Sequence, residues 1–176
     1  METDRLLIEK CLNRDPKAQE AMYKLYAPKM YGVCLRFAGN KMEAEDILQE
    51  GFIKIFTHLH EFRSEGPFEG WIRKTFINTA INYYHKKSRQ LAEIDIEQAS
   101  YAMSVEEGII DRISVGELTE LIQKLPEGYR IVFNLSIIEG FSHKEIGEML
   151  SISENTSKSQ LSRARASLQE MIMKRK

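Results

Sequence analysis

The stretch from Ser142 to Arg165, SHKEIGEMLSISENTSKSQLSRAR, predicts the fold around it most directly. Ser142 and Glu145 form a capping box at the start of one helix, and Ser153 can cap a second helix one short turn after the first. Two helices joined by roughly three to four residues are typical of the helix-turn-helix, whose second helix enters the major groove of DNA. The sequence therefore predicts this DNA-binding motif.

The predicted helix-turn-helix has an apolar side and a polar side. The apolar residues that fall between the two helices are Ile146, Leu150, Ile152 and Leu161. The opposite side carries Asn155, Lys158, Ser159, Gln160 and Arg163. Lysine and arginine attract phosphates, and amide, hydroxyl and guanidinium groups can read base edges. A basic helix alone is more often a solvated surface, but the caps, the short turn and a second basic cluster favour DNA binding.

Charge is distributed unevenly along the chain. The formal net charge is −1, which argues against nucleic-acid binding only if the charges are evenly spread. One basic cluster comprises Arg73, Lys74, Lys86, Lys87 and Arg89. The second comprises Lys158, Arg163, Arg165, Lys174, Arg175 and Lys176. Between them, residues 90–127 are strongly acidic. The pattern predicts two basic modules that flank an acidic segment.

Helical periodicity dominates the 176 residues, and no run alternates as a strand, so we predict an all-α fold. The first domain is expected over residues 1–89, with helices near residues 6–11, 16–38, 44–59 and 68–87. Asp15-Pro16 is expected to open the second of these, and Pro28 to bend or restart it. Leu6, Leu7 and Cys11 indicate the short first helix, and the residues expected to point inward on the second are Ala18, Met22, Leu25 and Tyr26.

The second domain is expected over residues 111–176 and contains the helix-turn-helix. Its other helices are predicted around residues 115–125 and directly after Pro126-Glu127. Between the domains, periodicity fades in residues 90–110 and the composition becomes acidic, which is typical of a linker. We therefore expect two small helical domains joined by a flexible acidic linker.

Several functional classes find no support in the sequence. No stretch approaches the roughly 20 apolar residues of a membrane span, and the first residues lack the basic start of a secretory signal. We expect a cytoplasmic protein without membrane insertion. The four histidines have no plausible catalytic partner, and neither a phosphate loop nor a metal-ligand spacing is present. We therefore predict no enzymatic activity, no cofactor and no metal site.

The two cysteines, Cys11 and Cys34, are too few for a disulfide framework and fall on predicted apolar helix faces. Neither belongs to a CxxC motif or lies near a histidine pair. Buried thiols in the core are the favoured interpretation. A redox or metal-binding role is the alternative.

The third and fourth predicted helices carry candidate binding surfaces. The third begins with EAEDILQE at residues 43–50, where acidic residues lie beside a rich apolar stripe. These carboxylates either complement the helix dipole or form a protein-docking surface. The fourth helix has a polar stripe of Lys74, Asn78, Asn82 and His85 near several aromatic residues. This stripe is either an ordinary exposed face or a site for unstacked bases.

Motifs over nearly the entire chain, taken in order, resemble sigma-70-type RNA polymerase factors of the extracytoplasmic-function group. They are AEDILQE at 44–50, FIK at 52–54, WI at 71–72, NTAINY at 78–83, LPE at 125–127, EGFS at 139–142 and SRAR at 162–165. Their joint order and spacing carry the resemblance. It implies that the first domain binds the clamp helices of core RNA polymerase and opens the −10 promoter element. The second domain would bind the −35 element as duplex DNA.

The resemblance also assigns roles by position. Asp46, Gln49 and Glu50 match the polymerase-docking surface. Asn78 and Asn82, with Lys74 and Arg63, match the −10 contacts, and the loop at residues 62–67 matches the one that holds a flipped base. Lys158, Ser159 and Arg163 fall where such factors contact the −35 major groove. An anti-sigma factor is implied as a further partner.

Three residues depart from the family pattern. Ser157 stands where an apolar residue is usual, Gln160 where arginine is common, and Ser136 where some relatives carry a basic backbone contact. These departures leave the −35 sequence open. The sequence as a whole predicts a promoter-specificity subunit of RNA polymerase. A stand-alone helix-turn-helix regulator is the second hypothesis, but it leaves the first domain unused, and a helical adaptor ignores both basic clusters.

Overall fold

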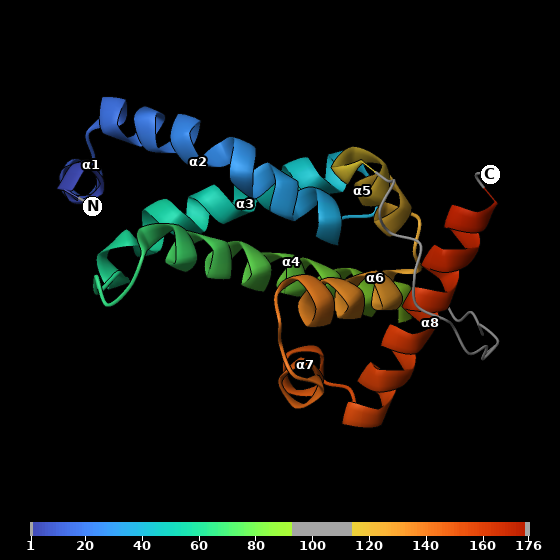
Figure 1. The fold of residues 1–176 in the computed structure, drawn as a ribbon. Helices are drawn as coiled ribbons and strands as arrows, with labels where there is room; N and C mark the ends of the chain where they lie inside the picture. The colour runs from blue at the N-terminus through green and yellow to red at the C-terminus, as the bar shows by residue number, and fades with distance from the viewer. Residues whose placement is uncertain (1, 93–113, 175–176) are drawn as a thin grey trace. The chain divides into compact units, whose positions relative to one another are not determined.

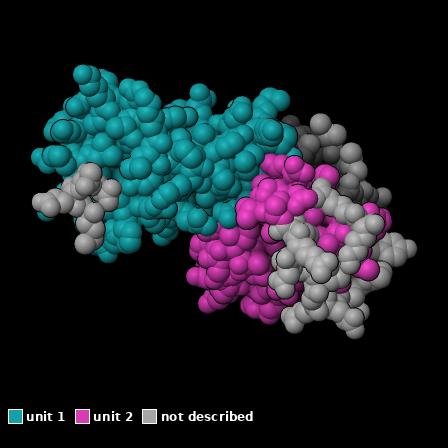
Figure 2. All heavy atoms as spheres, turned by 45° about the horizontal axis from the view of Figure 1, so that its top comes forward, with its two compact units in different colours: residues 1–83 teal, residues 84–176 magenta. Residues whose placement is uncertain are grey.

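The computed structural model describes residues 2–92 and 114–174, and every regular element within these ranges is helical (Figure 1). This confirms the predicted all-α fold. The predicted linker lies outside the described residues from residue 93 onward, and its first three residues belong to a helix. The chain divides into two compact units, Met1–Tyr83 and Tyr84–Lys176 (Figure 2).

The first unit contains α1 (Glu2–Leu12), α2 (Pro16–Phe37), α3 (Lys41–His58), the short η1 (Leu59–Glu61) and most of α4 (Phe68–Ala92). Side chains cap two of these helices, as short polar residues commonly do. Asp15 Oδ1 accepts a hydrogen bond from the Lys17 amide at 2.9 Å, and Asn40 Oδ1 accepts one from the Glu43 amide at 2.9 Å. Pro28 lies inside α2, which continues through it, so the helix does not restart there.

The core of the first unit lies where α2, α3 and α4 run side by side (Figure 1). The largest fully buried side chains there include Met22, Met30, Ile47, Ile55, Ile72 and Phe76. Helix α3 approaches α4 closely at Gly51, since a Cβ atom on Gly51 would lie 2.2 Å from Cε1 of Phe76. The ring of Phe76 also meets the ring of Phe52 edge-on, with 5.3 Å between centroids. The contact between α3 and α4 therefore requires glycine.

One leucine expected to point inward is exposed instead. Leu25 is 52% exposed. Leu25 precedes the buried Tyr26 by one residue, so the helix turns its side chain about 100° away from that direction. The prediction from apolar spacing therefore made the buried face of α2 wider than it is in the structure.

Both cysteines are buried and free, as the core interpretation predicts. Burial raises the pKa of the Cys34 thiol to about 12, and burial also raises the pKa of Cys11. Because the thiolate is the reactive form, both side chains are chemically quiet at neutral pH.

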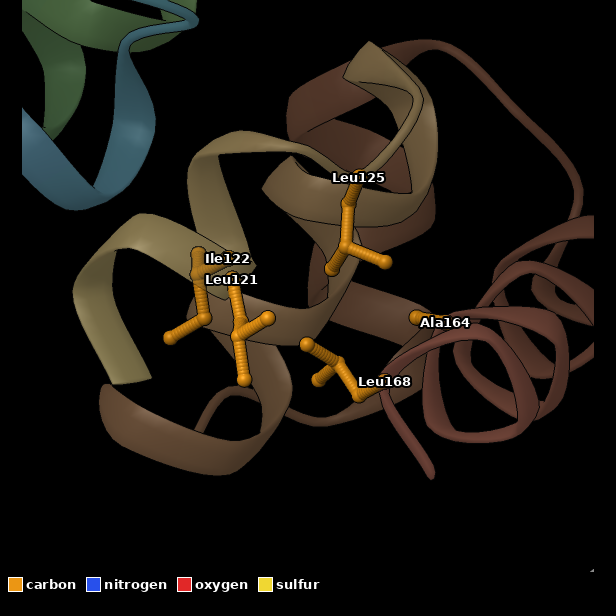
Figure 3. Close-up of a cluster of buried hydrophobic side chains, with 5 residues drawn as sticks. All are labelled: Leu121, Ile122, Leu125, Ala164 and Leu168. Atoms are coloured by element: carbon orange, nitrogen blue, oxygen red, sulfur yellow. The ribbon is translucent and has the colours of Figure 1, made fainter. Parts of the chain in front are cut away.

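The second unit contains α5 (Val115–Gln123), α6 (Glu127–Phe133), the π-helical η2 (Asn134–Ile138), α7 (His143–Leu150) and α8 (Glu154–Met173). Its buried cluster joins α5 and the turn after it to α8, through Leu121, Ile122, Leu125, Ala164 and Leu168 (Figure 3). Arg130 is buried beside this cluster, where Nη1 donates to the carbonyl oxygens of Gln123 and Leu125 at 3.1 and 2.9 Å. The guanidinium thus satisfies carbonyls that the end of α5 leaves free.

Candidate nucleic-acid and protein interfaces

Helices α7 and α8 form the predicted helix-turn-helix with the predicted caps. The carboxylate of Glu145 accepts from the amide and the hydroxyl of Ser142 at 2.8 and 2.6 Å. These hydrogen bonds lower the pKa of Glu145. At the start of α8, Ser153 Oγ accepts from the Thr156 amide at 3.0 Å. These caps define where each helix begins, and the start of the helix sets the direction in which each later side chain points.

Two residues shape the turn between α7 and α8, one through a left-handed backbone conformation and the other through the lack of a side chain. Ser151 has φ +57° and ψ +41°, the left-handed conformation that ends many helices. A Cβ atom on Gly147 would lie 2.8 Å from the carbonyl oxygen of Ile152, so the turn folds directly over this glycine. The compact turn sets the position of α8 on α7.

The apolar side of the motif is buried as predicted at Ile146, Leu150 and Leu161, and Ile152 is half-buried. Ser157, which replaces an apolar residue of the family pattern, is fully buried on the same side of α8. Its Oγ lies 2.9 Å from Nδ1 of His143. The hydrogen bond provides the partner that a buried hydroxyl requires.

Three of the predicted DNA-contacting residues are exposed on the outer face of α8: Asn155, Lys158 and Ser159. Arg163, one turn further along, is half-buried. Lys158 Nζ lies 2.6 Å from the carboxylate of Glu154, and this hydrogen bond is the main cause that lowers the Glu154 pKa. Ser159 Oγ donates to the carbonyl of Thr156 at 2.9 Å. Its lone pairs can therefore accept from a base while its proton stays in the helix.

Gln160 differs from the other four predicted residues because it lies beside α6. It is half-buried, and a Cβ atom on Gly128 would lie 3.3 Å from its Nε2 atom. Gln160 follows Ser159 by one residue, so the helix carries its side chain about 100° away from the outer face. The amide is therefore directed toward the domain rather than along the outer face.

Helix α4 carries the predicted polar stripe on its exposed side. Lys74, Asn78 and Asn82 follow one another at four-residue spacing, and all three are exposed. On the other side of the helix, Thr79 is fully buried, and its Oγ1 donates to the Thr75 carbonyl at 2.8 Å. The two asparagine amides are thus held one turn apart on a rigid element, without competing contacts to the core.

The loop before α4 begins at an aromatic cluster. The Phe62 ring lies 5.0 Å from the Phe68 ring and 5.7 Å from the Trp71 ring, measured between centroids. After Phe62, the residues up to Pro67 are exposed, including Arg63, and Ser64 has φ +58°. The cluster fixes one end of the loop against the helix that carries the asparagine stripe.

A groove of about 570 Å³ lies on the surface of α2 and α3. Its lining residues are Tyr23, Glu45, Asp46, Leu48, Gln49, Phe52, Ile53 and Phe56. Two predicted docking residues, Asp46 and Gln49, belong to it. Glu50 is exposed nearby in sequence and forms an ion pair with Lys54 at 2.7 Å. Acidic residues from the start of α3 and apolar side chains therefore line the same groove.

Sequence reasoning missed Tyr23 and Ile53 as members of this surface. Ile53 is 62% exposed. Its position on the polar side of an amphipathic helix could have been found from helical spacing. Tyr23 lies on α2, and only the packing of α2 on α3 brings it to the groove.

Among residues 2–92 and 114–174, no three histidine, cysteine or carboxylate side chains gather as metal ligands. In the same described part of the chain, no helix is long and apolar enough to cross a membrane.

Two family models match the chain in succession. Residues 22–90 match sigma-70 region 2, and residues 116–168 match sigma-70 region 4. The first match contains α3 and the asparagine stripe of α4, and the second contains the helix-turn-helix.

Similar proteins cover nearly the full chain. The ECF RNA polymerase sigma factor SigW of Bacillus subtilis is 33% identical over 90% of this chain and 90% of its own length. The RNA polymerase sigma-H factor of Pseudomonas aeruginosa is 28% identical over 97% of this chain and 94% of its own. A solved sigma factor RpoE, in complex with the anti-sigma factor NepR from Bartonella quintana, has the same fold. It aligns with a TM-score of 0.51 and 19% identity over 88% of this chain and 96% of its own. The chain therefore belongs to the extracytoplasmic-function group of RNA polymerase sigma factors, which are transcription initiation factors.

Proposed function

We propose that this sigma factor divides its work between two domains and three surfaces. Residues 1–89 bind core RNA polymerase and open the −10 element, and residues 111–176 bind the −35 element as duplex. The observation that carries the proposal is the coexistence of an acidic apolar groove, an exposed amide stripe and a solvent-facing recognition helix. A stand-alone DNA-binding regulator would need only the last of these.

The groove on α2 and α3 suits the clamp helices of core polymerase. Asp46 and Gln49 line it, and Glu50 is exposed one residue after Gln49. Among the described residues, neither Glu45 nor Asp46 has an ion-pair partner, so both carboxylates are available to cations of another protein. Apolar side chains on the groove floor supply the desolvated centre that stable protein interfaces require.

The recognition helix α8 suits duplex DNA in the major groove. Lys158 and Arg163 supply positive charge, and the Asn155 amide and the Ser159 hydroxyl can accept or donate hydrogen bonds at base edges. The Lys158–Glu154 pair is solvent-exposed, with both side chains about half accessible, so its net stabilisation is small. A phosphate can therefore replace Glu154 as the partner of Lys158.

The stripe on α4 suits an unstacked strand. Asn78 and Asn82 present amides that can pair with base edges, which duplex DNA keeps hidden until the strands separate. Lys74 and Arg63 add positive charge near the same element. Binding energy from these contacts offsets the cost of strand separation, and the protein supplies no catalytic activity of its own.

Two further properties follow from membership of the family. We infer that the protein acts in the bacterial cytoplasm, where core RNA polymerase meets the chromosome, and that an anti-sigma factor controls it. The fold shared with a sigma factor solved in such a complex supports the second inference. Co-expression with the cytoplasmic domain of a membrane protein from a neighbouring gene, followed by co-purification, tests it.

Transcription from a cognate promoter with purified core polymerase tests the whole proposal. Initiation should strictly require this protein, and Asp46→Arg should reduce both polymerase association and transcription. Binding of Asp46→Arg to a −35 duplex should be unchanged because Asp46 lies in the other compact unit, and an unchanged circular dichroism spectrum and melting temperature would show that the first unit is folded. A protein that binds duplex DNA but supports no initiation with core polymerase would instead be a stand-alone regulator.

A further inference from the structure

Helix α2 contributes one aromatic residue, Tyr23, to the lining of the groove. Tyr23 is 44% exposed, and its ring lies 4.6 Å from the ring of Phe52, measured between centroids. Phe52 in turn lies 6.1 Å from Phe56, and both phenylalanines line the groove. Three aromatic rings from two helices thus border one hollow.

The Tyr23 side chain is not part of the buried core of the first unit. The neighbouring positions on α2, Met22 and Tyr26, fill the core, whereas Tyr23 leaves it and covers only part of Phe52. Ile53, on the other helix, is 62% exposed beside the same hollow. Tyrosine is one of the residues that most often contribute a large share of the binding energy at a protein interface, and an exposed apolar patch beside it marks an interaction surface.

We infer that Tyr23 belongs to the polymerase-docking surface, where it and Phe52 hold an apolar side chain of the partner in the groove. This inference rests on the proposed polymerase-binding function of α3. The partner segment is a helix that presents an aliphatic or aromatic residue flanked by lysine or arginine. Its cations meet Glu45 and Asp46, which line the groove and have no ion-pair partner in the described part of the chain, while its apolar residue enters the hollow.

The hydroxyl of Tyr23 and its ring have separable roles in this interface. The contact with Phe52 is made by the ring, so phenylalanine at this position retains the aromatic wall. Alanine removes the wall and leaves the groove open on the α2 side. Binding should therefore depend on the ring and not on the hydroxyl.

The test measures affinity of the full chain for purified bacterial core RNA polymerase by fluorescence anisotropy. Tyr23→Ala should weaken binding about tenfold, a typical loss for an interface tyrosine, while Tyr23→Phe stays within about twofold of the natural chain. Leu25→Ala is the matched control, because Leu25 is also exposed on α2 but does not line the groove. It should leave affinity unchanged.

Asp46→Arg, measured in the same assay, separates failure of this inference from failure of the proposed function. Loss of binding by Asp46→Arg with normal binding by Tyr23→Ala would overturn the role of Tyr23 and leave docking on α3 intact. Equal losses in Tyr23→Ala and Leu25→Ala would also overturn it, because the effect would not be specific to the groove. Normal binding by every variant would overturn both the inference and the docking function.

Discussion

Nδ1 of His143 lies 2.9 Å from Oγ of Ser157, and this hydrogen bond joins the first helix of the helix-turn-helix to the recognition helix. Ser157 is fully buried, so its hydroxyl depends on this partner. The contact explains how a serine replaces an apolar residue inside the motif. It also ties the position of α8 to a residue on the buried side of that helix.

The first prediction is that His143 and Ser157 are energetically coupled. Ser157→Ala and His143→Ala should each destabilise the α7–α8 pair, and the double variant should lose less than the sum. The expected coupling free energy is about 0.5–1.5 kcal/mol, the usual net value of a hydrogen bond. Hydrogen exchange of amides in α7 and α8 reports local stability. Strictly additive effects would show that the two side chains do not interact.

The second prediction concerns the left-handed residue in the turn. Ser151→Gly should stabilise the helix-turn-helix by about 0.5–1 kcal/mol, because glycine adopts positive φ without the steric cost of a Cβ atom. Ser153→Ala, two residues later, should instead destabilise it by about 1 kcal/mol through loss of the helix cap. Thermal unfolding followed by circular dichroism compares the pair. A lower melting temperature for Ser151→Gly would contradict the prediction.

The third prediction concerns the close approach of α3 and α4. Gly51→Ala should destabilise the first unit by about 1–3 kcal/mol, because the new methyl group would overlap the Phe76 ring. Gly32→Ala is the control, since Gly32 is helical, exposed and has open space around it, and it should gain up to about 1 kcal/mol. Urea unfolding followed by fluorescence of Trp71, the single tryptophan, measures both variants. Equal stabilities would show that Phe76 moves aside freely.

The fourth prediction separates promoter binding from promoter opening. Arg163→Ala should lower promoter occupancy about ten- to a hundredfold, because a good base contact contributes roughly 1–3 kcal/mol. Asn78→Ala should leave most of the occupancy but reduce opening at the −10 element. Permanganate footprinting of exposed thymines measures opening, and a binding assay on the same promoter measures occupancy. Normal opening by Asn78→Ala would remove this residue from the −10 site, and equal losses in both signals for both variants would contradict the division of labour.

The sequence by itself determined most of the α-helices, the caps at Asp15, Ser142 and Ser153, and the helix-turn-helix. These features are local, because a capping box such as Ser142–Glu145 and an apolar stripe at helical spacing depend on residues within a few positions of one another. The exposed face of α4 and the buried cysteines followed from the same periodicity. The order of the motifs along the chain predicted the family, and the comparisons with known proteins confirmed it.

Only the tertiary structure decided which residues of different helices meet. Tyr23 reaches the groove because α2 lies on α3, and Gln160 turns toward Gly128 because α6 lies beside α8. Gly51 is required because the Phe76 ring occupies the space of its missing side chain. Helical spacing gives the direction of each side chain around its own axis, but not the neighbour it finds there. That neighbour is set by close packing between elements distant in sequence.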